Sequence, residues 1–310
     1  MKKTKKTMLV ALVAVSATAV VNAVIVQTTP DQLWNDVAGW GDGSTALSGT
    51  ETYQANARFY TPTTGGSFDG GFLEMADGSN LQMQNDGGDS EAISANFILS
   101  GTTGKMGPRF STPSHVAVNG TFSVNTGATF KFLSRNDSTT AERNQRIDAQ
   151  FSGGSGATLL LAGAGTIDTT AGRQYIQISN DLNSFDGTWS VDGTRAIFTS
   201  GDAVGGGDVD VSNDGYLRVN TDWSGSSLTA VTGSEVEIKD GFAWTIDGLT
   251  VNGSSVANGT YTASQLNTLT SDTIFTGGTG TIQVIPEPAT LGLVAAFGGA
   301  VLFIRRRFMI

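Results

Sequence analysis

Short stretches of alternating apolar and polar residues recur along most of the chain. Many begin at a glycine and then run apolar, polar, apolar. Such copies are GTFSV from Gly120, GATFKF from Gly127, GATLLL from Gly156, GTWSV from Gly187, GDVDV from Gly207, GYLRV from Gly215, GSEVEI from Gly233 and GTIQV from Gly280. Strict alternation predicts half-buried β-strands. No segment of residues 24–285 keeps the 3.6-residue period of an amphipathic helix.

The close spacing of these copies predicts a stack of short strands. One short strand per turn of chain, with several strands in a repeat of roughly 20–50 residues, is typical of solenoids. We therefore predict an all-β fold, a right-handed parallel β-helix, with an antiparallel β-sandwich or jelly roll as the alternative. In the β-helix, six side chains should point inward and stack on neighbouring coils: Phe130, Phe132, Leu159, Leu161, Trp189 and Val191. Corner glycines should supply the positive φ of tight turns.

The predicted solenoid body spans residues 61–285, and residues 24–60 form a predicted N-terminal cap region. The stretch Gln32–Gly43 contains two tryptophans, which we expect to cover the end of the stack. A platform for binding carbohydrate is the alternative for these rings. The polar stretch Thr139–Asp148 is expected to be a surface loop or a single helical turn.

The first 23 residues have the layout of a secretory signal peptide. Four lysines lie within the first seven residues, Met8–Val21 is apolar, and Val21-Asn22-Ala23 offers small residues for cleavage after Ala23. The sequence thus predicts a signal helix over 1–23 and passage through an export translocon. A retained N-terminal anchor is the alternative.

The last 25 residues, 286–310, have three parts in a fixed order. Pro286-Glu287-Pro288 is stiff and extended, Thr290–Ile304 carries no charge, and Arg305-Arg306-Arg307 follows. Residues 289–304 approach the length of a transmembrane helix when the arginines reach the interface. Arginines on this flank favour a cytoplasmic C-terminus. A helix buried in a globular core is the alternative.

These three parts resemble the PEP-CTERM sorting signal of bacterial surface proteins. The resemblance implies that Pro286, Glu287, Pro288 and Arg305–Arg307 act as the sorting signal. It also implies a temporary inner-membrane anchor, which an exosortase-type processing enzyme removes before the protein reaches the cell surface or an exopolysaccharide matrix. Arg58–Gly101 and Leu249–Val284 are similar to β-helical bacterial surface proteins with autotransporter-passenger repeats, which implies an elongated extracellular β-helix.

Composition narrows the classes of function. The chain has no cysteine, so packing and backbone pairing must stabilise an exported body without disulfides. Removing the four lysines and three arginines of the two ends leaves 11 basic residues, and removing Glu287 leaves 27 acidic ones, for a charge near −16. Nucleic acid is therefore not an expected partner, because phosphate binding requires a basic surface.

Few residues qualify for site chemistry. His115 is the only histidine, and we interpret it as an ordinary loop or core residue, since a zinc site needs more His or Cys ligands. Asp208, Asp210 and Asp214 lie in a glycine-flanked stretch and are weak candidates for Ca²⁺, whose ligands are oxygens. The segment GGGDVD is similar to part of a calcium-binding nonapeptide repeat but lacks tandem copies. Beyond this calcium, no cofactor is predicted.

Two hypotheses for the body follow. The first is a non-enzymatic structural or adhesive β-helix, for which exopolysaccharide is a candidate partner. The second is a polysaccharide-active lyase or hydrolase, which would require suitably placed carboxylates or a basic residue near a carboxylate. No residue is singled out as catalytic. A groove holding carboxylates, arginines and aromatic rings would favour the enzyme, and an acidic solenoid without one would favour the structural role.

Overall fold

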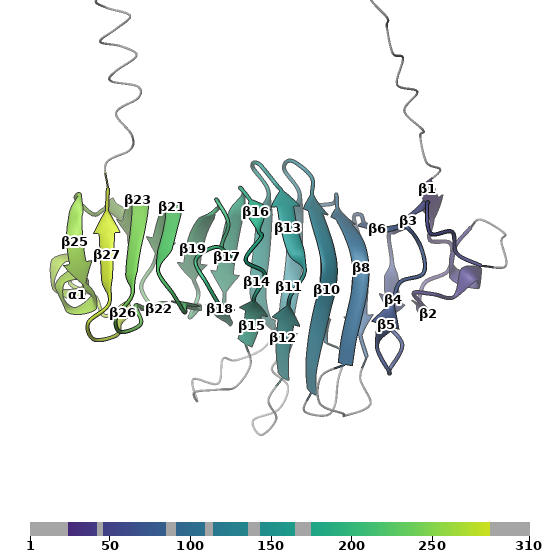
Figure 1. Cartoon of the computed structure of the whole chain (residues 1–310), viewed down its shortest axis with the longest axis horizontal. Coiled ribbons are helices and arrows are strands. Elements are labelled where there is room, and N and C mark those ends of the chain that lie inside the picture. The colour runs from purple at the N-terminus through teal and green to yellow at the C-terminus, as the bar shows by residue number, and fades with distance from the viewer. Residues whose placement is uncertain are drawn as a thin grey trace, which may run out of the picture.

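The computed structural model describes residues 24–41, 46–84, 91–108, 114–135, 143–164 and 175–285. Most of these residues belong to two large β-sheets (Figure 1). Sheet 1 contains β1 (Val24–Val26), β3 (Thr52–Ala55), β5 (Gly66–Ser67), β6 (Phe72–Met75), β8 (Glu91–Leu99), β10 (Ser114–Val124), β12 (Arg143–Ile147), β13 (Gln150–Gly153), β15 (Tyr175–Ile178), β16 (Ser184–Phe185), β18 (Arg195–Phe198), β20 (Tyr216–Val219), β22 (Glu235–Glu237) and β26 (Phe275–Thr276).

Sheet 2 faces sheet 1 across the core. It contains β2 (Gln32–Leu33), β4 (Arg58–Tyr60), β7 (Asn80–Met83), β9 (Gly104–Pro108), β11 (Thr129–Arg135), β14 (Thr158–Ala164), β17 (Thr188–Asp192), β19 (Asp208–Ser212), β21 (Trp223–Ala230), β23 (Ala243–Val251), β24 (Ser254–Ser255), β25 (Gly259–Thr262) and β27 (Thr281–Val284). The described helices are the 3₁₀ turn η1 (Val37–Gly39) and the α-helix α1 (Ala263–Thr270).

The chain passes back and forth between the two sheets, and most strands pair in parallel with a strand of the next coil. In sheet 1, for example, β18 lies between β15 and β20, while in sheet 2, β17 lies between β14 and β19. Among the described residues, antiparallel pairing is confined to β23 with β24, β25 with β27, and one bridge between Gln27 and Trp40. The mostly parallel, elongated stack agrees with the predicted β-helix, and the antiparallel sandwich or jelly roll is wrong (Figure 1).

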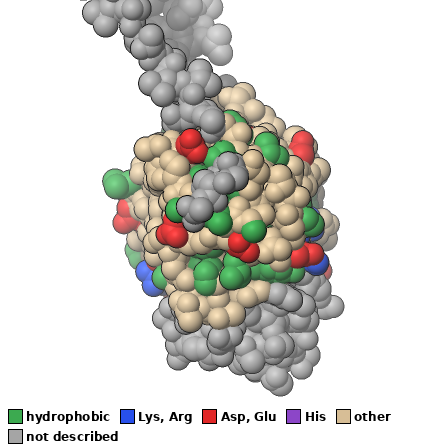
Figure 2. Space-filling model, turned by 90° about the vertical axis from the view of Figure 1, so that its right-hand side faces the viewer, with side chains coloured by type: hydrophobic (Ala, Val, Ile, Leu, Met, Phe, Trp, Pro, Cys, Tyr) green, Lys and Arg blue, Asp and Glu red, His purple; other side chains and the backbone are tan. Residues whose placement is uncertain are grey.

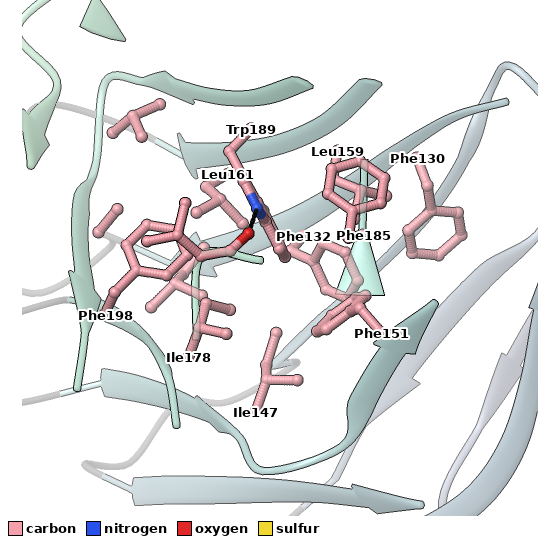
Figure 3. Packing of buried hydrophobic residues seen from close by; sticks show 14 of the residues in the cluster. Phe130, Phe132, Ile147, Phe151, Leu159, Leu161, Ile178, Phe185, Trp189 and Phe198 are labelled. Atoms are coloured by element: carbon pink, nitrogen blue, oxygen red, sulfur yellow. Dashed lines mark hydrogen bonds between the residues drawn. The ribbon is translucent and has the colours of Figure 1, made fainter. Parts of the chain in front are cut away.

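The predicted inward positions are confirmed. Phe130 pairs with Leu159, which pairs with Trp189, so these three side chains stack through three coils. Phe132, Leu161 and Val191 form the neighbouring column in the same way, and all six side chains are at most 1% exposed. Figure 3 shows five of them among the buried residues of both sheets. The indole Nε1 of Trp189 is satisfied in the core, because it donates to the carbonyl oxygen of Val204 at 2.8 Å.

Aromatic rings from successive coils of sheet 1 form a second kind of stack. The rings of Phe97, Phe122 and Phe151 are nearly parallel, with centroids 4.6 Å apart at each step. This step is close to the ~4.8 Å distance between paired strands. In-register identical residues therefore bring the rings to stacking distance without distorting the sheet.

The recurring glycines have two different roles. Gly127 adopts φ +72°, as predicted for a corner, and Gly120, Gly156 and Gly233 also have positive φ. Gly187, Gly207, Gly215 and Gly280 are not among the positive-φ residues, so the corner prediction is wrong for them. Instead they let coils approach closely: a Cβ on Gly215 would lie 2.6 Å from the carbonyl oxygen of Val191.

The polar stretch Thr139–Asp148 is only partly described, and its described part corrects a prediction. Arg143–Ile147 is strand β12, paired with both β10 and β15, rather than a loop or helical turn. Its alternation was hidden because a glutamine, Gln145, takes an inward position and is fully buried. Among the described residues, the side-chain amide of Gln145 has no hydrogen-bond partner.

Each end of the stack is closed by elements that do not continue the parallel ladder. At the N-terminal end, Gly41 N donates to Val26 O along an antiparallel return, which covers part of the β1 edge. Figure 2 shows this end, where apolar and acidic side chains are interspersed. At the C-terminal end, β25 pairs antiparallel with β27, and α1 contacts β25 and β26. Such features block edge-to-edge pairing of chains.

The two tryptophans of the N-terminal region are packing residues. Trp34 is fully buried and Trp40 is 4% exposed. The Trp40 ring contacts Tyr53 and Phe59 edge-on, with centroids 5.4 Å and 6.4 Å away. A sugar platform requires an exposed ring face, so the alternative of a carbohydrate platform is wrong for both residues.

Within the described ranges, no helix is both long enough and apolar enough to cross a membrane. The expected signal helix over 1–23 and the expected transmembrane helix over 289–304 lie outside the described residues.

Candidate functional site

Arginines, tyrosine and glutamates gather on the outer face of sheet 1. Arg195 of β18 pairs with Tyr216 of β20, which pairs with Glu235 of β22. In the neighbouring column Arg218 pairs with Glu237. These side chains point outward because the intervening residues of the same strands, Ala196, Leu217 and Val236, belong to the core. We call these five outward residues the Arg–Tyr–Glu cluster.

The members of the cluster contact one another directly. The guanidinium carbon of Arg195 lies 4.0 Å from the centre of the Tyr216 ring, a cation–π contact. The Tyr216 hydroxyl donates to Glu237 Oε2, and Arg218 Nη1 lies 3.6 Å from the same oxygen. The next coil adds a further contact, because Thr276 Oγ1 donates to Glu235 Oε1 at 3.0 Å.

Burial and neighbouring charges act against each other at Arg195. Burial lowers the pKa of this guanidinium, the Glu235 carboxylate raises it, and the nearby Arg218 lowers it further. Tyr216 is only 6% exposed although it projects from the outer face of the sheet. Its burial follows from the cover that Arg195 provides.

The cluster has the residue types of a polysaccharide-cleaving site, but most of its groups are already engaged within the protein. The buried Nε of Arg218 is the exception, since it has no hydrogen-bond partner among the described residues. The Glu237 carboxylate accepts a hydrogen bond from the Tyr216 hydroxyl and forms an ion pair with Arg218. One face of the Tyr216 ring is covered by Arg195. The two arginines are matched by two glutamates. Chemically, the arrangement links strands β18, β20, β22 and β26 through their side chains.

Aspartates at the corners of the coils make a second set of links. Asp77 Oδ1 accepts from the backbone N–H groups of Thr102 and Thr103, at 2.6 Å and 3.1 Å, and from both threonine hydroxyls. These bonds lower the pKa of Asp77, the backbone bond from Thr102 being the largest cause. Asp240 likewise accepts from Gly278 N and Thr279 N in a later coil.

A recess of about 660 Å³ lies beside α1, and its polar groups are also bonded internally. Asn267 donates to Phe275 O at 2.7 Å and accepts from Phe275 N at 2.9 Å. Asp272 accepts from Thr232 Oγ1 and Asn252 Nδ2, and these bonds lower its pKa. The recess therefore presents a wall whose hydrogen-bonding groups hold the last coils together.

The weak calcium candidates do not form a recognisable metal centre. Asp208 and Asp210 project from the same face of β19, half-buried, and Asp214 lies exposed in the following turn with φ +60°. Within the part of the chain that the structure describes, no three or more Asp, Glu or His side chains gather where they could hold a metal ion. Calcium binding by these residues stays a prediction.

Several other sites from the sequence cannot be placed. The expected sorting signal, Pro286, Glu287, Pro288 and Arg305–Arg307, lies outside the described residues, as does the expected cleavage position Ala23. His115 lies on strand β10, and its side chain is likewise outside the description.

Sequence reasoning missed the Arg–Tyr–Glu cluster, because its members come from separate coils. The alternation within each strand shows that these residues point outward. The cluster becomes visible only when the register between the strands is also known. Comparison of the chain with known proteins found no matching family model, no matching curated protein and no matching solved structure.

Proposed function

We propose that the chain is an exported bacterial cell-surface or extracellular-matrix protein with a structural or adhesive role. Its body would be a right-handed parallel β-helix that acts as a spacer. One observation carries this proposal: the polar groups of the corners and of the Arg–Tyr–Glu cluster bond to neighbouring coils rather than converging, unpaired, on a cavity. Polar groups that bond to neighbouring coils stabilise the stack, and few of them are left to act on a substrate.

The proposed delivery route depends on the two ends of the sequence. Residues 1–23 would direct the chain to an export translocon, and residues 286–310 would hold it temporarily in the inner membrane with a cytoplasmic C-terminus. An exosortase-type enzyme would then recognise Pro286-Glu287-Pro288 and remove the tail, releasing the body to the surface or matrix.

The mass of the surface form tests this route. In a bacterium with an exosortase-type enzyme, the protein recovered from the surface should lack residues 1–23 and Arg305–Arg307. A variant with Glu287→Ala and Pro288→Ala should keep its tail and remain in the membrane fraction. Thr279→Ala and Gln283→Ala, just before the tail, provide the matched control, which should be processed like the original chain. Surface protein that retains Arg305–Arg307 would refute the route.

A polysaccharide-active enzyme is the second candidate function, and the Arg–Tyr–Glu cluster is the observation that favours it. Glu235 and Glu237 share one face of β22, beside two arginines and a tyrosine. Their assignment as catalytic groups would require Glu237→Gln to abolish the release of new sugar ends. If no polysaccharide is cleaved by the unaltered chain, this candidate fails.

A further inference from the structure

Two of the three lysines in residues 24–285 lie side by side on the outer face of sheet 2. Lys105 of β9 is the direct register partner of Lys131 of β11. Their side chains point outward, because the adjacent Met106, Phe130 and Phe132 are buried in the core. The third lysine, Lys239, lies elsewhere and approaches the ring of Phe242.

This pairing of like charges has no structural explanation within the described residues. Like charges on directly opposite strand residues destabilise a sheet. Arg58, Arg146 and Arg218 each lie within ion-pair distance of a carboxylate. In the described part of the chain, no carboxylate is within that distance of Lys105 or Lys131, although acidic residues outnumber basic ones by more than two to one over residues 24–285.

The two lysines line a recess of about 370 Å³, which lies within the range of small-ligand sites. Three threonines and two half-buried leucines add polar and apolar surface to the recess. The hydroxyls of Thr102 and Thr103 already donate to Asp77, so Thr129 is the threonine whose hydroxyl is offered to a ligand. The full lining is Thr102, Thr103, Gly104, Lys105, Thr129, Lys131, Leu133 and Leu160. We call this the lysine recess. It combines polar and apolar surface with two lysines that have no carboxylate within ion-pair distance among the described residues.

We propose that the lysine recess binds an acidic polysaccharide through the carboxylates of its uronate units. Charge complementarity selects an anion. The recess crosses strands β9, β11 and β14, which are separated by ~4.8 Å steps. Lys105 and Lys131 can therefore meet carboxylates of one short uronate segment laid across these strands. The apolar faces of the rings can rest on Leu133 and Leu160.

The small size of the recess favours a short uronate segment over nucleic acid. A charge near −16 over residues 24–285 disfavours long contact with any polyanion, and two lysines provide too small a basic surface for the many phosphate contacts of nucleic acid. We expect a short uronate segment to add contacts between the apolar faces of its sugar rings and Leu133 and Leu160. This inference rests on the proposed location in an extracellular matrix, where such polymers are accessible.

Binding of the full chain to polygalacturonate tests the proposal, with neutral dextran as the comparison. The double variant Lys105→Gln with Lys131→Gln should bind at least tenfold more weakly, while Lys239→Gln, the matched control, should bind like the original chain. Binding should weaken as salt is added, because screening reduces exposed charge contacts. The melting temperature of the double variant should equal or exceed that of the original chain, since a repulsive pair is removed.

Three results would overturn the proposal: equal binding of dextran and polygalacturonate, unchanged affinity in the double variant, or equal binding of single-stranded DNA of similar charge. A melting temperature that falls in the double variant would show instead that the lysines stabilise the fold. None of these results bears on the tail-processing experiment, so failure of this proposal and failure of the export route are separate outcomes.

Discussion

Acidic side chains at the corners of the coils act as caps for the next coil. Asp77 shows this most fully, since its carboxylate accepts four hydrogen bonds from Thr102 and Thr103. Asp and Asn are common turn residues because their side chains bond to nearby backbone. Here the bonded backbone is about one coil away in sequence. Such capping bonds explain why acidic residues occur beside turns, and the explanation does not require a bound metal ion.

The lowered pKa of Asp77 predicts how stability depends on pH. A carboxyl whose folded pKa lies below its unfolded value contributes stability above the ordinary aspartate pKa of about 3.9, and this contribution is lost as the pH falls through the folded value. Asp77→Asn should therefore lower the melting temperature at neutral pH and reduce its loss on acidification. Thermal denaturation followed by circular dichroism over this pH range measures both effects.

The control for Asp77→Asn is Asp202→Asn. Asp202 is exposed, and its side chain makes no hydrogen bond in the described structure. Its substitution should leave the dependence of melting temperature on pH unchanged. If both variants show the same dependence as the original chain, the corner bonds of Asp77 do not contribute to stability.

Because the backbones of neighbouring coils are closely packed at Gly215, we expect one added methyl group there to destabilise the fold. An added Cβ would lie 2.6 Å from Val191 O and 2.8 Å from Ser212 O, both rigid backbone atoms. Gly215→Ala should lower the free energy of unfolding by roughly 1–3 kcal/mol. Gly49→Ala, which meets nothing within 4 Å, should be close to neutral. Urea denaturation of the two variants compares them, and equal stabilities would contradict the close approach.

At the scale of the elements, the ring stack joins three coils of sheet 1. Phe122 lies between Phe97 and Phe151, and all three side chains are fully buried. Phe122→Ala should reduce the free energy of unfolding by about 3–5 kcal/mol, through lost burial and the cavity that remains. Phe72→Ala provides the comparison, because Phe72 is 40% exposed, and it should have a much smaller effect in the same urea titration. Similar losses in both variants would argue against the stack.

Elements with regular alternation could be predicted from the sequence, and those without it could not. The columns through Phe130 and Phe132 follow directly from period-two patterns that begin at glycines. Strand β12 was missed because Gln145 occupies an inward position that the pattern reserves for apolar residues. The Arg–Tyr–Glu cluster and the lysine recess could not be found, since both depend on the register between strands about 20 to 30 residues apart.

At the scale of the whole molecule, the fold is a rod with different ends. Sheet 2 runs from β2 to β27 through ten inter-strand steps, which gives a length of roughly 50 Å at ~4.8 Å per step. Residue 24 begins the first strand at one end, and Val284 ends β27 at the other (Figure 1). The proposed sorting tail, residues 286–310, directly follows this last coil in sequence. While the tail is anchored, the C-terminal coils would lie nearest the membrane.

We propose that the body of the protein is a scaffold or adhesive module rather than an enzyme. The most direct test incubates the full chain with a panel of acidic and neutral polysaccharides and measures both new reducing ends and retention of the protein on insoluble polymer. We expect no new reducing ends on any polymer, and we expect the protein to be retained on the acidic polymers. New reducing ends that disappear in the Glu237→Gln variant would contradict it and establish the Arg–Tyr–Glu cluster as an active site.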